Sequence, residues 1–171
     1  IPEKSVTLPA NAGSVSSWSR EVMGILVATM GPWMVGGVAA AWFLQQVVAL
    51  FLARYWQAGL YNPGGFRAEF HGLRLGRWLL IALPLLLVWA MASGQTASLP
   101  AQLVLVLEAG LLLQGVALVH GLVGRLGAAT GWLIGFYSLL VVAFPYGVTL
   151  VTIAGYMDGW LDFRAKVRSR S

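Results

Sequence analysis

Residues 33–52 have the sequence WMVGGVAAAWFLQQVVALFL, with no charged side chain at any position. A helix rises about 1.5 Å per residue, so this stretch would be about 30 Å long, the thickness of the hydrocarbon core of a bilayer. It is followed by Arg54, Tyr55 and Trp56, residue types that anchor a transmembrane helix at the membrane–water interface. The segment therefore predicts a membrane-spanning helix.

The composition of the whole chain points to the same class. Hydrophobic residues make up 58% of the 171 residues and charged residues only 10%, and the mean hydropathy is +0.77, whereas a soluble domain carries about 25% charged residues. There is no cysteine, which excludes a disulfide framework and a thiolate metal site. The isoelectric point of 10.1 does not indicate a nucleic-acid partner, because the basic residues lie at the edges of apolar segments, where the positive-inside rule explains them.

The N-terminal part is more polar than the rest. Residues 1–13 contain two prolines and predict an extended lead-in. Residues 14–31 predict an interfacial or re-entrant helix that ends at Gly31-Pro32, since a proline lacks a backbone donor and clashes with the preceding turn. Residues 32–163 then predict a single helical membrane domain, and residues 164–171 a basic cytoplasmic tail.

Five spans are predicted within this domain, at about residues 33–53, 78–92, 99–122, 128–143 and 147–160. The last two divide a stretch of 30 uncharged residues, 128–157. Arginines mark both the loop after the first span and the C-terminal tail as cytoplasmic, so an even number of crossings must lie between them. Residues 144–147, Phe-Pro-Tyr-Gly, are the natural turn. A rival topology, with one kinked helix over 128–157 and an external tail, stays open. The predicted class is an all-α integral membrane protein with five transmembrane helices and a broken N-terminal helix.

Glu108 is the charged residue placed deepest in a predicted span, about eight residues and so roughly 12 Å from its outer end. A carboxylate at that depth is costly, and no Lys or Arg lies within any predicted span. It must be protonated, hydrogen-bonded, or in contact with a ligand cation or water. The predicted ligand site joins it to hydroxyl groups at similar depth: Glu108, Tyr137, Ser138, Thr149 and Thr152. The alternative is a neutral acid bonded between helices, with hydroxyls bonded to their own backbone.

Small residues in the first span form two overlapping pairs four positions apart, Gly36 with Ala40 and Gly37 with Ala41. Such pairs let helix backbones approach closely in lipid. They predict either an internal packing face or a docking face for a partner subunit.

The predicted cytoplasmic loop concentrates positive charge, which attracts anionic lipid headgroups. Lipid or partner contact is predicted for Arg54, Arg67, Arg74 and Arg77. Asp158 and Asp162 are expected to pair with loop arginines rather than to bind a metal. The sequence has no HExxH, GxSxG or P-loop motif, so we expect neither an enzyme nor a bound cofactor.

Several short motifs carry a family resemblance: LYNPGGF at 60–66, EFH at 69–71, LRLG at 73–76 and MDGWLDFR at 157–164. They resemble the YybS-like bacterial membrane proteins, a family of unknown function whose longer members this chain would match in their C-terminal part. That family has been grouped with the S components of energy-coupling-factor vitamin transporters. The resemblance implies a compact bundle that binds a small solute near its outer face and docks on a coupling subunit through residues 36–41. An S component has six spans, one more than is counted here.

Two functions follow from these observations. The first is a multi-pass protein of the bacterial inner membrane, with a cytoplasmic C-terminus, that binds or transports a small solute. The second is a scaffold or assembly subunit without a ligand, which associates with other membrane subunits or with itself. In both cases the lipid bilayer is the expected surrounding partner.

Overall fold

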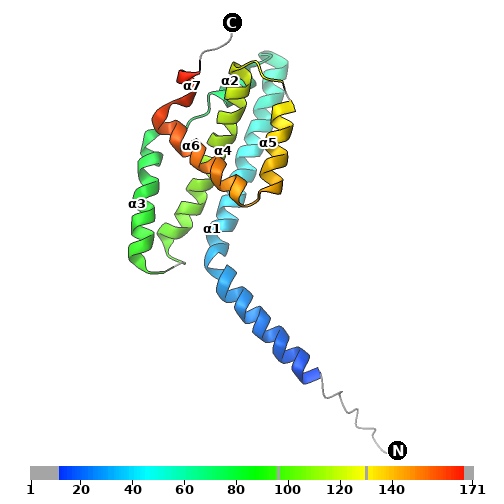
Figure 1. Cartoon of the computed structure of the whole chain (residues 1–171), viewed down its shortest axis with the longest axis vertical. Helices are drawn as coiled ribbons and strands as arrows, with labels where there is room; N and C mark the ends of the chain where they lie inside the picture. The colour runs from blue at the N-terminus through cyan, green and yellow to red at the C-terminus, as the bar shows by residue number, and fades with distance from the viewer. Residues whose placement is uncertain (1–11, 96, 130, 168–171) are drawn as a thin grey trace, which may run out of the picture.

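The computed structural model describes residues 12–95, 97–129 and 131–167, and this part of the chain is helical without any strand (Figure 1). Its helices are α1 (Ala12–Tyr61), α2 (Gly65–His71), α3 (Arg77–Ser93), α4 (Leu99–Arg125), α5 (Gly131–Val142), α6 (Tyr146–Leu161) and α7 (Phe163–Lys166). Two of these, α1 and α4, are long and apolar enough to cross a membrane. The all-α class is confirmed, and the two long apolar helices are compatible with a membrane protein.

The helix positions after the first loop follow the sequence prediction closely. Each of the four predicted later segments coincides with one helix, from α3 to α6, and the predicted Phe-Pro-Tyr-Gly turn separates α5 from α6. The predicted loop contains the short helix α2, whose Phe66 and Phe70 rings lie 5.9 and 5.5 Å from the Phe51 ring of α1. Of the predicted lead-in, residues 1–11 lie outside the described residues, as do residues 168–171 of the predicted tail.

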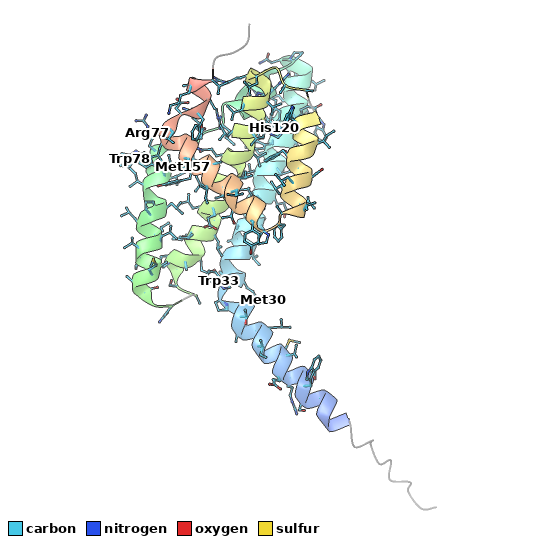
Figure 2. The ribbon with its side chains drawn as sticks, in the orientation of Figure 1. Met30, Trp33, Arg77, Trp78, His120 and Met157 are labelled. Carbon is cyan, nitrogen blue, oxygen red and sulfur yellow. The ribbon has the colours of Figure 1, made fainter. Side chains whose placement is uncertain are left out.

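The N-terminal helix differs from the prediction. We expected a helix that ends at Gly31-Pro32, but α1 runs without interruption from Ala12 to Tyr61 and contains Pro32. The ribbon changes direction close to Met30 and Trp33, so that the first part of α1 projects away from the other helices (Figure 2). Proline removes one hydrogen bond of the ladder and bends a helix where packing preserves the turns on either side.

A side chain from α4 supports this bend. Gln102 donates from Nε2 to the carbonyl oxygen of Pro32 at 2.5 Å and accepts at Oε1 from the backbone N–H of Gly36, also at 2.5 Å. These two backbone groups are four residues apart and are the natural partners of one another in an α-helix. The Gln102 amide thus inserts into the ladder just after the proline, a recognised cause of helix bending. The contact with Gln102 of α4 therefore stabilises α1 as a continuous helix across Pro32.

Gly36 is required for this contact, because a Cβ atom there would lie 2.9 Å from the Gln102 Cα atom. We expect Gly36→Leu to lower the free energy of unfolding by about 1–3 kcal/mol through overpacking. The matched control is Gly37→Leu, since nothing lies within 4 Å of a Cβ atom at Gly37. Both variants are compared with the wild type by the midpoint of thermal unfolding in mild detergent. Equal destabilisation by the two substitutions would contradict the packing described here.

Helix α4 is the centre of the structure and contacts each of the other described helices. Its closest neighbour is α6, which approaches at a pair of facing glycines. A Cβ atom at Gly155 of α6 would lie 2.7 Å from the Gly115 backbone nitrogen of α4. Glycine at both positions therefore permits backbone contact between the two helices.

A buried amide and a buried ion pair fix the helices around this contact. Gln114 is 0% exposed, donates to the Gly155 carbonyl oxygen at 2.6 Å and accepts from the Leu75 N–H at 2.6 Å. One turn further on, Arg164 Nε lies 3.1 Å from Asp158 Oδ2, with side-chain exposures of 3% and 0%. Arg164 also donates to the His71 carbonyl oxygen at 2.5 Å. These contacts tie α2, α4, α6 and α7 together at one end of the bundle.

Removal of one partner from a buried ion pair leaves an uncompensated charge, which costs about 3–5 kcal/mol. We therefore expect Arg164→Gln to cause a large loss of stability, measured by thermal or denaturant unfolding in detergent. Arg74→Gln serves as the control, because Arg74 forms a surface pair with Asp162 at exposures of 40% and 45% and surface pairs contribute little. An Arg164→Gln protein as stable as the Arg74→Gln protein would show that the buried pair is dispensable.

Candidate functional site

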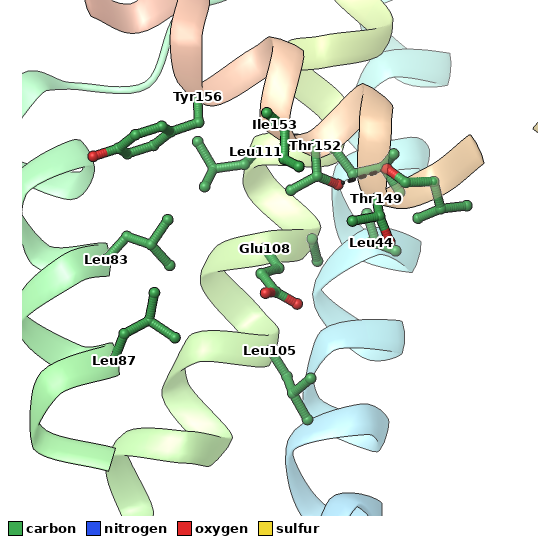
Figure 3. Close-up of a pocket in the computed structure, with 13 residues that line it drawn as sticks. Leu44, Leu83, Leu87, Leu105, Glu108, Leu111, Thr149, Thr152, Ile153 and Tyr156 are labelled. Carbon is green, nitrogen blue, oxygen red and sulfur yellow. Dashed lines mark hydrogen bonds between the residues drawn. The ribbon is translucent and has the colours of Figure 1, made fainter. Parts of the chain in front are cut away.

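A cavity of about 480 Å³ lies between α1, α3, α4 and α6, within the size range of small-molecule sites. In Figure 3, leucines of α3 lie on one side of the cavity and Leu44 and Thr149 lie on the other, with Tyr156 of α6 above the leucines of α3. The residues that line it are Leu44, Leu83, Leu87, Leu105, Glu108, Ala109, Leu111, Leu112, Val148, Thr149, Thr152, Ile153 and Tyr156. Most of these side chains are apolar, and Glu108 is the charged one.

Glu108 stands out among the polar side chains of its helix. Between the first turn of α4 and Arg125, polar side chains occur at every sixth position: Gln102, Glu108, Gln114 and His120. Gln102 and Gln114 bond to backbone groups of other segments, and His120 Nδ1 lies 2.9 Å from the Val116 carbonyl oxygen. The Glu108 carboxylate forms no hydrogen bond or ion pair with the described residues. The protein supplies partners for its neighbours on α4 but leaves this carboxylate facing the cavity.

The two threonine hydroxyl groups of the cavity already donate to backbone carbonyl groups at the start of α6. Thr152 Oγ1 donates to the Val148 carbonyl oxygen at 3.0 Å, and Thr149 Oγ1 donates to the Pro145 carbonyl oxygen at 3.3 Å. Each hydroxyl oxygen still has a free lone pair. Glu108, Thr149 and Thr152 thus share one cavity, as the sequence prediction grouped them, and Glu108 is the group without a protein partner.

Tyr137 and Ser138, the other two predicted site residues, do not line this cavity. Tyr137 lies on α5 with its hydroxyl oxygen 3.5 Å from His120 Nε2, and Ser138 is exposed on the same helix. The prediction counted depth along each helix, which does not show which helices enclose the cavity, and α5 contributes none of its lining residues. Tyr156 lines the cavity instead, one turn beyond Thr152.

The two small-residue pairs of α1 separate into an inner and an outer face. Gly36 is buried against Gln102 and Ala40 is half-buried, whereas Gly37 and Ala41 are exposed. The first pair is an internal packing face. The second pair remains exposed on the bundle surface.

The arginines around the loop also separate into two groups. Arg54 Nε donates to Glu69 Oε2 at 2.7 Å, and Arg74 Nη1 donates to Asp162 Oδ2 at 3.0 Å. The Arg74 bond, followed by the Ala165 N–H, lowers the pKa of Asp162 to about 2. The expected pairing of Asp162 with a loop arginine is therefore confirmed, while Asp158 pairs with Arg164 from the tail. Arg67 and Arg77 form no ion pair with any described residue.

Within the described ranges, no three His, Cys, Asp or Glu side chains come together as a metal site would require. No protein-family model, curated protein or solved structure matches the chain. The resemblance to YybS-like proteins therefore stays a prediction, and the functional argument has to come from the geometry.

Proposed function

We propose that the chain is a multi-pass protein of the bacterial inner membrane, with its C-terminus in the cytoplasm, that binds a small solute in the Glu108 cavity. The solute class is an organic molecule with an apolar body and a positively charged or hydrogen-bond-donating group. A site of this kind suits the solute-binding subunit of a transporter, which is the role of an S component.

The surface of the bundle supports the membrane location. Large apolar side chains are exposed along α1, α3, α5 and α6, which suits contact with lipid and not with water. Tryptophans are exposed towards the arginine-rich end, where aromatic residues concentrate at a membrane–water interface: Trp56, Trp78, Trp132 and Trp160. Figure 2 shows Trp78 beside Arg77 at this end of α3.

The arginine contacts support the orientation. Arg54 of α1 pairs with Glu69 of α2, and Arg74 pairs with Asp162 at the end of α6. Arg125 of α4 donates to the carbonyl oxygen of Arg164 in α7. These contacts gather basic residues from four segments at one end, namely α1, the loop before α3, α4 and α7, as the positive-inside rule expects of a cytoplasmic face.

The unpartnered Glu108 carboxylate is the observation that carries the proposed solute binding. An ionisable group inside a membrane is costly, and is commonly found where a substrate or an ion binds. A cavity of about 480 Å³ that is mostly apolar with one convergent acid is typical of a site that orients a small amphipathic ligand. Leucines would cover the apolar body, and the carboxylate would accept hydrogen bonds from the charged group.

Glu108→Gln tests this proposal, because it keeps the size of the side chain and removes its negative charge. We expect affinity for a bound amine to fall about 10- to 100-fold, the usual effect of losing a hydrogen bond to a charged group. The full chain would be purified in mild detergent, its bound small molecules identified by mass spectrometry, and binding measured with a panel of hydrophobic amines and their matched alcohols.

Thr152→Val is the matched control within the same cavity. Its hydroxyl already donates to the Val148 carbonyl oxygen, so we expect affinity to change by less than about threefold. If Glu108→Gln bound the amines as tightly as the wild type, or if neither protein bound any of them, the solute-binding function would be wrong.

A second candidate function rests on the exposed pair Gly37 and Ala41. A small-residue face on a membrane helix suits close packing against another helix, as in a scaffold or in docking to a coupling subunit. In that case Gly37→Leu should dissociate a complex that Glu108→Gln leaves intact. Co-purification from native membranes, followed by mass spectrometry of the proteins, would distinguish the two.

A further inference from the structure

A second polar cavity lies at the arginine-rich end, about 20 Å along α4 from Glu108 at 1.5 Å per residue. Its volume is about 500 Å³, and it is formed where α2 packs on the last turns of α4. Figure 1 shows these two elements side by side at the end from which the C-terminus leaves. The lining residues are Gly64, Arg67, Ala68, His71, Gly121, Gly124 and Arg125.

The charges around this cavity are not balanced by the protein. Arg67 and Arg125 both line it, and neither forms an ion pair with a described residue. Arg54 and Arg74, by contrast, are each matched with a carboxylate. Like charges held close together repel one another unless a counter-charge is present. The two guanidinium groups therefore have no carboxylate partner among the described residues, and an anion from outside the chain could supply the counter-charge.

His71 adds a donor to the same cavity. Burial, and after it the charge of Arg67, lowers the pKa of the His71 imidazole. The ring is then neutral at pH 7 and presents one N–H group. Two guanidinium groups and one imidazole N–H form a donor set suited to an oxyanion with several acceptor oxygens.

Glycines on α4 let His71 and Arg67 of α2 pack closely against its last turns. A Cβ atom at Gly124 would lie 2.9 Å from His71 Cε1 and 3.5 Å from Arg67 Nη2. At Gly121 it would lie 3.1 Å from the His71 carbonyl oxygen. A side chain at Gly124 would therefore displace His71 and Arg67, so glycine at this position keeps both donors close to α4 and to Arg125.

We propose that Arg67, His71 and Arg125 form a binding site for a phosphate group. The group belongs either to an anionic phospholipid at the membrane surface or to a soluble phosphate compound. This site is independent of the solute proposed for the Glu108 cavity, and loss of function at one leaves the other unchanged. Basic cavities between helices at the cytoplasmic side are a recognised setting for lipid phosphate.

Arg67→Gln is the variant that tests the site, because Arg67 is exposed and its loss breaks no ion pair. Arg77→Gln is the matched control: it removes the same charge from the same end, and Arg77 does not line the cavity. The full chain in mild detergent would be titrated with phosphatidylglycerol and with phosphatidylcholine, and the bound lipid counted by native mass spectrometry. Inorganic phosphate and pyrophosphate would be added as competitors.

We expect phosphatidylglycerol to bind the wild type about tenfold more tightly than Arg67→Gln, with Arg77→Gln close to the wild type. Gly124→Leu, which would displace His71 and Arg67 without a change of charge, should weaken binding in the same way. Displacement by inorganic phosphate or pyrophosphate would assign the site to a soluble phosphate, and its absence to the lipid. Equal weakening by Arg67→Gln and Arg77→Gln, or no weakening by either, would overturn the proposal, because attraction would then come from general surface charge or not at all.

Discussion

The backbone contact between α4 and α6 at Gly115 and Gly155 is the constraint on which the remaining structure depends. It brings the Gly155 carbonyl oxygen within reach of Gln114, whose amide also holds the loop before α3. Arg164 then closes the same end by joining the start of that loop, α4 and α6. In an apolar surrounding each of these polar groups would be costly without its partner. These contacts therefore favour one arrangement of the helices.

Glu108 differs from the neighbouring polar residues of α4, because its side chain has no hydrogen-bond partner among the described residues. Its helix places Gln102 and Gln114 six residues to either side, and each of them bonds to two groups of other segments. The same architecture offers Glu108 leucines and two threonines whose hydroxyl protons are already donated elsewhere. Glu108 is exposed in the bundle itself and adds nothing to the packing of the helices. Under the proposed function, its partner is the bound solute.

The sequence predicted the helices and the charge distribution, because both depend on local composition. The span limits, the turn at Pro145 and the pairing of Asp162 with a loop arginine all came from apolar run lengths and charge positions. The roles of Gln102 and Gln114 left no such signal, since their partners are backbone groups of distant segments. The continuity of α1 through Pro32 was missed for the same reason. Tyr137 and Ser138 lie on α5, which contributes no residue to the Glu108 cavity, because depth along a helix does not show which helices will enclose a cavity.

The lengths of α5 and α6 indicate from which side of the membrane a solute would reach the cavity. They contain 12 and 16 residues, about 18 and 24 Å, and so fall short of a bilayer core of about 30 Å. In the proposed orientation both helices begin or end at the cytoplasmic side, so their turn at Pro145 lies within the outer half of the membrane. Thr149, in the first turn of α6, lines the cavity, which therefore lies close to that turn. Beyond it the bundle consists of α1, α3 and α4 alone, and a solute would approach Glu108 from the outer side, where α6 no longer covers α4.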